Sequence, residues 1–276
     1  MLLAVPNVSE GRDRSTLDAI GAAFGPGLIH SSADPDHHRA VFTVQGEPGA
    51  LAEAVLDGVR EAIARIDLTD HEGAHPRVGA VDVAPIVYLD AAQRGAAIAE
   101  ALVLADRLAA ELDLPVFLYG ALAGGRTRAE LRKGGLPELQ RRMQAGELAP
   151  DAGPTRLHPT AGAVLVAARP PLAAFNLELA APATVDVARA IAARIREGGS
   201  EGLAGVRALG LALTRAGIVQ VSTNIEDLTI TTPGDVTRAV QRHATVAAAE
   251  LVAPAPRRAF ESFPAEIPLR GAPLLD

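Results

Sequence analysis

The segment HEGAHPRVG, residues 71–79, places two histidines and an arginine within a short stretch of chain. His71 and His75 fit the H-E-x-x-H pattern of zinc proteases, which binds zinc when both imidazoles share one face of a helix. Gly73 and Pro76 oppose a helix here, because the residue before a proline is pushed out of helical conformation. We therefore predict a loop and expect no metal.

Without a metal, the same loop offers acid–base and anion-binding groups. A histidine such as His75 takes and gives protons near neutral pH. Arg77 can hold a carboxylate in a bidentate fork. Asp82 follows on a predicted strand, where it either orients a histidine or caps a turn. A solvated polar loop without chemistry is the alternative, and the residues alone leave both interpretations open.

Two further clusters combine polar side chains with a predicted strand end or a long loop. His38 and Arg39 stand at the mouth of a strand over 40–45, and a plain polar strand start is the alternative interpretation. The stretch PDAGPTRLHPTAG is a long loop, and loops of this length are often functional. Its Gly153 and Gly162 permit close backbone approach to a ligand. Arg156 and His158 of this loop supply hydrogen-bond donors, and Arg39, Arg77 and Arg156 are candidate carboxylate clamps.

Composition excludes several classes of function. The chain has 276 residues, no cysteine and a net charge of -7, so a thiol nucleophile is excluded and nucleic acid is not expected as a partner. No dinucleotide fingerprint, phosphate loop or G-x-S-x-G motif is present. No apolar run approaches the ~20 residues of a membrane span, and the amino terminus lacks a secretory leader. We expect a cytoplasmic protein without a membrane partner.

The pattern of strands and helices predicts two subdomains of the α+β class. Strands at 28–33 and 40–45 follow each other too closely for a helical crossover, which disfavours a doubly wound parallel sheet. The order strand-helix-strand-strand-helix-strand occurs in residues 1–170 and again in 171–276. A long helix is expected over 235–251. We predict two α/β sandwiches with antiparallel or mixed sheets and helices on one face.

Seven pieces of the sequence, spread from residue 4 to about residue 232, carry a family resemblance. They are AVPNVSEGR, HHRAVFTVQG, HEGAHPRVGAVDVAPI, LPVFLYG, PDAGPTRLHPTAGAVLVAAR, AFNLEL and QVSTNIEDLTIT. In this order they resemble the glutamate formiminotransferase family, the front half of formiminotransferase-cyclodeaminase. The chain resembles a stand-alone form, because it ends too soon to hold a cyclodeaminase half.

The resemblance implies a reaction, a fold and a site. The family moves a formimino group from N-formimino-L-glutamate to N5 of its co-substrate tetrahydrofolate, in histidine catabolism and one-carbon metabolism. Two ferredoxin-like subdomains with folate between them, and a homodimer, are implied. The catalytic general acid/base falls on His75. The expected substrate-binding residues are His38, Arg39, Arg77, Asp82, Gly153, Pro154, Thr155, Arg156, Leu157, His158, Pro159, Thr160, Ala161 and Gly162.

Two rival functions fit the same residues. An enzyme on this scaffold could use another formimino or formyl donor, such as N-formiminoglycine, or hydrolyse the amidine without folate. A non-catalytic folate-binding protein is the second rival, although the presence of His75 weighs against it.

Overall fold

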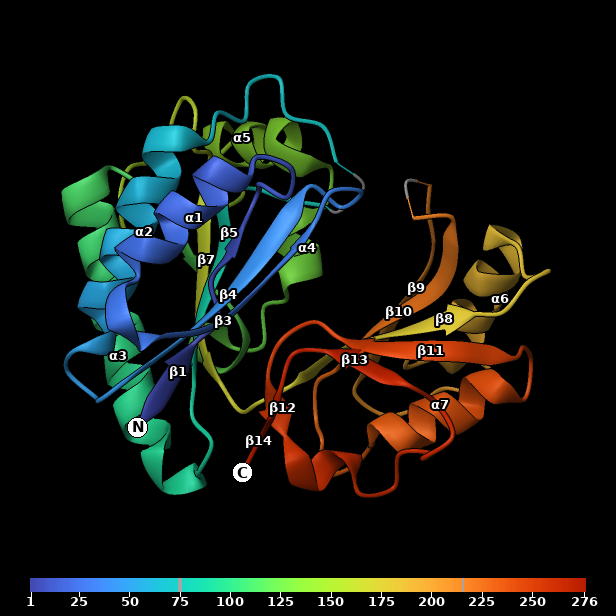
Figure 1. Ribbon diagram of the computed structural model, residues 1–276. Helices are drawn as coiled ribbons and strands as arrows, with labels where there is room; N and C mark the ends of the chain where they lie inside the picture. The colour runs from blue at the N-terminus through green and yellow to red at the C-terminus, as the bar shows by residue number, and fades with distance from the viewer. Residues whose placement is uncertain (74–75, 215) are drawn as a thin grey trace. The chain divides into compact units, whose positions relative to one another are not determined.

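The computed structural model describes residues 1–73, 76–214 and 216–276. The chain divides into two compact units, Met1–Pro170 and Pro171–Asp276, called here the first and the second unit (Figure 1). Strands in mixed and antiparallel sheets combine with helices in both units, which confirms the predicted α+β class. His75, the predicted acid–base residue, lies outside the described residues.

The first unit begins with a strand-helix-strand-strand-helix-strand motif. Its elements are β1 (Leu2–Ala4) and β2 (Asn7–Val8), α1 (Arg14–Ala23), β3 (Leu28–Asp34), β4 (Arg39–Gly46), α2 (Leu51–Arg65) and β5 (Val81–Val87). The strands pair antiparallel in the order β3, β4, β1 with β2, and β5. This is the split-βαβ arrangement expected of a ferredoxin-like sandwich.

The rest of the first unit widens this sheet. The added elements are α3 (Arg94–Leu112), β6 (Val116–Leu118), α4 (Arg128–Arg132), α5 (Gly135–Gln144) and β7 (Val164–Arg169). Strand β7 pairs parallel with β5, and β6 pairs parallel with β7. Every residue of β5 is buried, as is typical of strands in a parallel arrangement covered on both faces.

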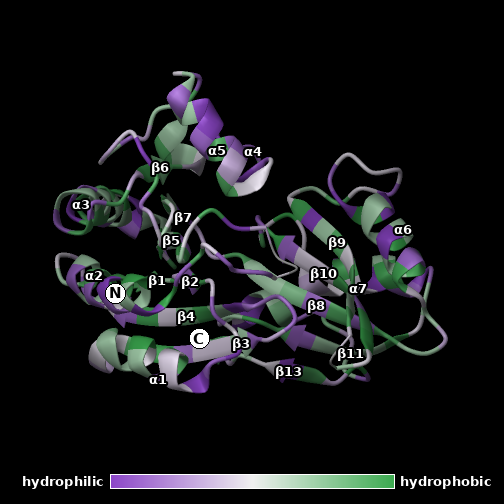
Figure 2. Cartoon of the chain, turned by 90° about the horizontal axis from the view of Figure 1, so that it is seen from above, coloured by the Kyte–Doolittle hydropathy of each residue, from purple (hydrophilic) through white to green (hydrophobic). Residues whose placement is uncertain are grey.

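Helices cover both faces of this widened region. On one face, α1, α2 and α3 bury side chains such as Ile20, Val55 and Leu104 against the sheet. On the other, Leu131 of α4 and Leu139 of α5 pack against the β5–β7–β6 part of the sheet. Figure 2 shows the strands lying between these two groups of helices. Helices on one face, as predicted, therefore describe the ferredoxin-like part of this unit but not its extension.

The second unit repeats the motif in a simpler form. Its elements are β8 (Ala173–Leu179), α6 (Val185–Ile195), β9 (Val206–Leu213), β10 (Ile218–Ile225), α7 (Pro233–Gln241), β11 (Val246–Leu251), β12 (Ala255–Pro256), β13 (Leu269–Gly271) and β14 (Leu274–Leu275). The sheet order is β13, β11, β8, β10, β9, with the β11–β8–β10–β9 pairs antiparallel. Aromatic rings of Phe175, Phe260 and Phe263 meet edge-on or tilted in its core.

The predicted helix over 235–251 is wrong in its second half. Helix α7 begins at a capping box formed by Thr232 and Asp235 and ends at Gln241. Residues 246–251 instead form β11, which pairs with β8 and completes the sheet. The alanine-rich sequence VAAAEL fits a helix by propensity, and the sheet partner overrides that weak local preference.

Candidate active site

Two loops that lie far apart in sequence meet in the first unit. We call residues 68–80 the histidine loop and residues 153–162 the glycine loop. The backbone N–H of Leu68 donates to Thr160 O (2.8 Å), and that of Ala80 donates to Ala161 O (2.9 Å). Ala163, just after the glycine loop, donates to Val78 O at 2.8 Å. These bonds hold the two loops side by side where β5 and β7 begin.

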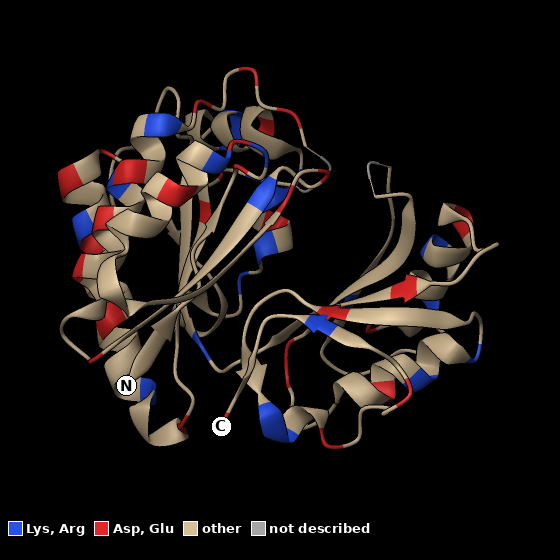
Figure 3. Ribbon diagram, in the orientation of Figure 1, with Lys and Arg blue, Asp and Glu red and all other residues tan. Residues whose placement is uncertain are grey.

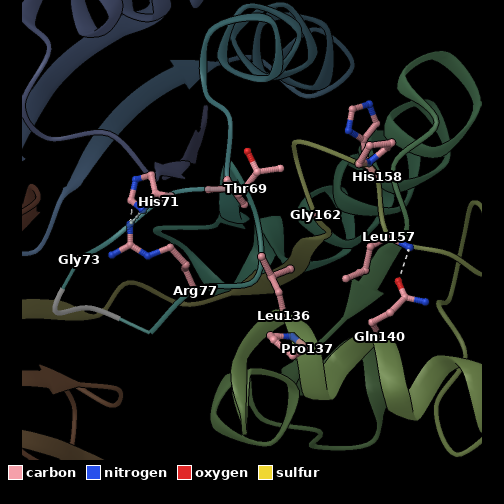
Figure 4. A pocket seen from close by; sticks show the side chains of 12 residues that line it. Thr69, His71, Gly73, Arg77, Leu136, Pro137, Gln140, Leu157, His158 and Gly162 are labelled. Carbon is pink, nitrogen blue, oxygen red and sulfur yellow. Dashed lines mark hydrogen bonds between the residues drawn. The ribbon is translucent and has the colours of Figure 1, made fainter.

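A cavity of about 660 Å³ lies where the loops face α5, a volume that suits a small organic ligand. Its lining includes five of the predicted substrate-binding residues, namely Arg77, Leu157, His158, Pro159 and Gly162, together with His71 and Gly73 of the same sequence motif. The other lining residues are Leu68, Thr69, Leu136, Pro137 and Gln140. In Figure 4 the side chains of His71 and Arg77 form one end of the cavity. Leu136 and Leu157 project toward its middle from opposite sides. The cavity therefore has a polar end and an apolar wall.

Arg77 ties the histidine loop to the turn before β4. Its Nη1 donates to His38 O (3.0 Å) and contacts His71 Nδ1 (2.9 Å), while its Nη2 donates to His37 O (2.8 Å). Arg77 was predicted to bind a carboxylate, and its described bonds give it a positioning role as well. Burial lowers its pKa, but a guanidinium stays charged at neutral pH.

His71 is held as a neutral imidazole in one tautomer. Its Nε2 lies 2.6 Å from Ser9 O, which can only accept, so Nε2 carries the proton. Nδ1 then accepts from Arg77. Burial lowers the pKa of His71, and the positive charge of Arg77 acts in the same direction. With both nitrogens engaged, His71 is poorly placed to serve as a general base.

His38 stacks on His71 from the turn before β4. The ring centroids lie 4.1 Å apart at 33°, and His38 has a left-handed backbone with φ 49°. Burial, followed by the neighbouring His71, lowers the pKa of His38 to about 4. The neutral ring accepts the Gly11 N–H at Nδ1 (3.1 Å). The 3.4 Å approach of Glu10 to the same atom is consequently not an ion pair at neutral pH.

The low pKa of His38 predicts that the protein loses stability in mild acid. The pKa of His38 falls from 6.5 in an unfolded chain to about 4 in the folded one, so the unfolded state binds the proton first as pH drops. The contribution of the neutral His38 ring to the free energy of unfolding is complete above pH 6.5. A contribution on the order of 2 kcal/mol is lost as the pH falls from about 6.5 to about 4.

Urea unfolding at several pH values measures this effect. The matched variant is His38→Asn, because asparagine tolerates the left-handed backbone and does not titrate in this range. We expect a flatter pH dependence of the free energy of unfolding in the variant. An identical slope in both proteins between pH 4 and pH 6.5 would contradict the assignment.

A buried ionic cluster lies at the base of the histidine loop. Asp82 is fully buried and accepts from Arg39 Nη1 (2.7 Å), from Val78 N (2.9 Å) and from Arg132. Arg39 also donates to Asn7 Oδ1 through Nε (3.1 Å) and Nη2 (2.8 Å). Burial lowers the pKa of Arg39 to about 10, opposed by the attraction of Asp82.

Asp82 therefore caps the turn at Val78, one of the two roles foreseen for it, and in addition joins two arginines. Arg39 and Arg132 share the single carboxylate of Asp82, which leaves an excess of positive charge near the site. Figure 3 shows basic residues on β4 and α4, the elements that carry these two arginines. Arg39 and Asp82 do not occur among the described residues that line the cavity.

The glycine loop is closed by its own backbone. His158 and Gly162 exchange N–H···O bonds of 2.9 and 3.0 Å, and the His158 ring accepts the Ala161 N–H at Nδ1 (3.0 Å). Gly162 has φ 70°, and a Cβ there would overlap Val78 O. Only glycine combines this conformation with this approach. His158 is left presenting an Nε2–H donor, since Nδ1 is occupied.

The predicted loop residues divide into two groups. Residues 157–159 and Gly162 line the cavity, while the buried Ala161 and the half-buried Thr160 supply backbone contacts. Residues 153–155 lie outside the lining. Arg156 pairs with Asp113 at 2.7 Å on an exposed surface. The structure brings only the second half of the predicted loop to the cavity.

Sequence reasoning missed Arg132, Leu136, Pro137 and Gln140. Arg132 lies on α4 and the other three lie on α5, and no motif marks them. In the sequence, the Gly134–Gly135 pair indicates a turn but does not show which loop the following helix faces. The long-range packing of α5 is what brings these residues to the site.

In 1–73, 76–214 and 216–276, no group of three or more His, Asp or Glu side chains could hold a metal ion. No helix within those ranges is long and apolar enough to cross a bilayer.

The fold defines a two-unit α+β protein, and comparison with known proteins agrees with that division. The formiminotransferase domain, N-terminal subdomain, matches residues 1–169. The formiminotransferase domain matches residues 174–260. The chain thus belongs to the formiminotransferase family, and its enzyme class is that of the transferases.

Two relatives are glutamate formimidoyltransferases of similar length. That of Streptococcus pyogenes serotype M1 is 36% identical over 228 residues, or 80% of this chain and 76% of the relative. That of Thermoplasma acidophilum is 32% identical over 230 residues, or 80% and 75%. The formimidoyltransferase-cyclodeaminase of Sus scrofa is 36% identical over 239 residues, which are 82% of this chain but 44% of that protein.

Proposed function

We propose that this chain transfers the formimino group of N-formimino-L-glutamate to N5 of tetrahydrofolate, with His75 as the general acid and base. The observation that carries the proposal is the cavity at which the histidine and glycine loops meet. The family resemblance assigns the catalytic histidine to the first of these loops and the folate contact to the second. The Streptococcus and Thermoplasma relatives are named glutamate formimidoyltransferases, which supports formiminoglutamate as the donor.

The reaction needs one group that moves a proton between two nitrogens. N5 of tetrahydrofolate attacks the amidine carbon, and His75 takes the N5 proton as the tetrahedral intermediate forms. The bond between that carbon and the glutamate nitrogen then breaks, and His75 returns the proton to the leaving nitrogen. His71 and His158 each have Nδ1 engaged. Their engagement supports His75 as the residue that accepts the proton.

Arg77 is expected to contribute mainly to the binding of the anionic donor. Arg77→Ala should raise the KM for formiminoglutamate about tenfold or more, because a charge-assisted hydrogen bond of this kind contributes about 1.5–3 kcal/mol. Arg77→Lys should rescue little, since an ammonium lacks the planar fork that spans the carbonyls of His37 and His38. Steady-state kinetics test both variants. A turnover defect with an unchanged KM would count against the clamp.

A donor and acceptor panel tests the proposed function. Purified protein is assayed with formiminoglutamate, formiminoglycine and formylglutamate, each with and without tetrahydrofolate. We expect release of the free amino acid, glutamate or glycine as the donor dictates, only from formiminoglutamate and only when tetrahydrofolate is present. Glutamate release without folate would indicate an amidine hydrolase, and folate binding without any turnover would indicate a non-catalytic binding protein. The homodimer and the cytoplasmic location stay predictions.

A further inference from the structure

The start of α5 forms a wall of the cavity that no motif assigns to any function. Leu136 and Pro137, the α5 wall, face the glycine loop and the histidine loop (Figure 4). We infer that this wall binds the fused pterin ring of the acceptor and thereby determines affinity for reduced folates. The inference rests on the proposed function, since it names the part of the co-substrate that this wall contacts.

Contacts of Leu136 place it within the site. A Cβ added at Gly162 would lie 2.9 Å from Leu136 Cδ2, so this side chain packs over the bare backbone of the glycine loop. Leu136 is partly buried and touches two hydrophobic cores of the first unit, and Leu157 joins one of them from the glycine loop. The hydrophobic core therefore holds the buried side of the wall in place, and the wall presents its remaining apolar surface to the cavity.

The fold fixes where this wall stands. Gly134 and Gly135 have φ of 74° and 68°, a pair of left-handed residues that turns the chain sharply between α4 and α5. Arg132 anchors the end of α4 to the buried Asp82. Leu139 anchors the other side of α5 in the core. The position of the wall thus depends on the same cluster that caps the histidine loop.

The chemistry of the two substrates decides which of them meets this wall. Formiminoglutamate is acyclic and carries two carboxylates, and burying such charges against leucine and proline is costly. The pterin has a flat pyrimidine ring and a reduced ring with C–H groups, whose faces suit a wall of this kind. N5 belongs to that ring and must reach residue 75, and Gly73 and Arg77, which flank residues 74–76, line the same cavity. The ring, rather than the p-aminobenzoyl tail, is hence the part expected here.

Equilibrium binding of three probes by calorimetry tests the assignment. The probes are 5-formyltetrahydrofolate, ring-only 6-methyltetrahydropterin and tail-only p-aminobenzoylglutamate. Leu136→Ala should weaken the first two about tenfold through lost apolar contact and leave the third unchanged. Leu136→Met, which keeps the apolar volume, should stay close to wild type. Affinities that are unaffected by Leu136→Ala, or a loss confined to the tail probe, would overturn the inference.

The control is Leu148→Ala, because Leu148 packs against the same core as Leu136 but does not occur in the lining. Thermal melts show whether each variant folds. If Leu136→Ala does not fold, the exposed Pro137→Ser carries the same expectation with a smaller loss. Transfer measured on the same samples separates the two proposals. If transfer is intact and folate binding does not depend on Leu136, the role of the α5 wall is refuted and the proposed function stands. If binding depends on Leu136 but no transfer occurs, the proposed function is refuted and the role of the α5 wall stands.

Discussion

Replacing Asp82 with asparagine is expected to lower the free energy of unfolding by about 3–5 kcal/mol, because it breaks a buried ion pair and leaves its partners charged. The side chain is fully buried, and those of Arg39 and Arg132 are only 11% and 12% exposed. Two guanidinium groups would then lie beside each other without the carboxylate that joins them. Urea unfolding followed by circular dichroism measures the change.

Two comparisons make this prediction specific. Asp113→Asn removes a carboxylate of the exposed Arg156 pair, and such surface pairs contribute about 0–1 kcal/mol. Adding Arg132→Gln to Asp82→Asn should recover part of the loss, since one of the two unpaired charges is then gone. If Asp82→Asn cost no more than Asp113→Asn, the ionic cluster would not support the fold in the way described.

Replacing His75 is expected to have the largest effect on activity. His75→Gln and His75→Ala should lower kcat about 10²–10⁴-fold, the usual contribution of a positioned acid–base group. Glutamine keeps polarity and approximate size but cannot carry the proton. Folding should be unchanged, because the described contacts between the two loops are backbone bonds of other residues. Steady-state kinetics and thermal melts provide the measurements.

The controls for His75 separate catalysis from binding. His243→Gln is the matched substitution, since the His243 imidazole contacts Glu201 (2.9 Å) in the second unit and belongs to no part of the proposed site. Added imidazole should restore part of the turnover of His75→Ala by replacing the missing base. Binding of 5-formyltetrahydrofolate should stay within about threefold of wild type. Near-wild-type turnover of either His75 variant would refute the role.

Local patterns in the sequence predicted most of the fold. The strands predicted over 28–33 and 40–45 are β3 (Leu28–Asp34) and β4 (Arg39–Gly46), because segments rich in glycine, proline and aspartate delimit each of them in the sequence. The pattern failed at 246–251, where alanine-rich sequence suits a helix as well as a strand. It also could not show that α4 and α5 cover a second face of the sheet, since that depends on packing between distant elements.

The candidate site was predictable in its loops but not in its surroundings. The proline and glycines of HEGAHPRVG correctly indicate a loop, and described residues 71–73 and 76–77 are not helical. The same residues give no sign that His71 is locked by Ser9, or that Arg77 reaches the carbonyls of the turn before β4. Those partners lie about 40 to 60 positions away in sequence. Only the sheet register brings them together.

The central claim is that the formimino carbon passes to folate N5, and a single-turnover experiment tests it most directly. Enzyme in excess is mixed with tetrahydrofolate and formiminoglutamate whose formimino carbon carries an NMR-active isotope. The account predicts that the label appears on N5 of tetrahydrofolate as one equivalent of unlabelled glutamate is released. Labelled formamide or formylglutamate, with the folate left unlabelled, would contradict it.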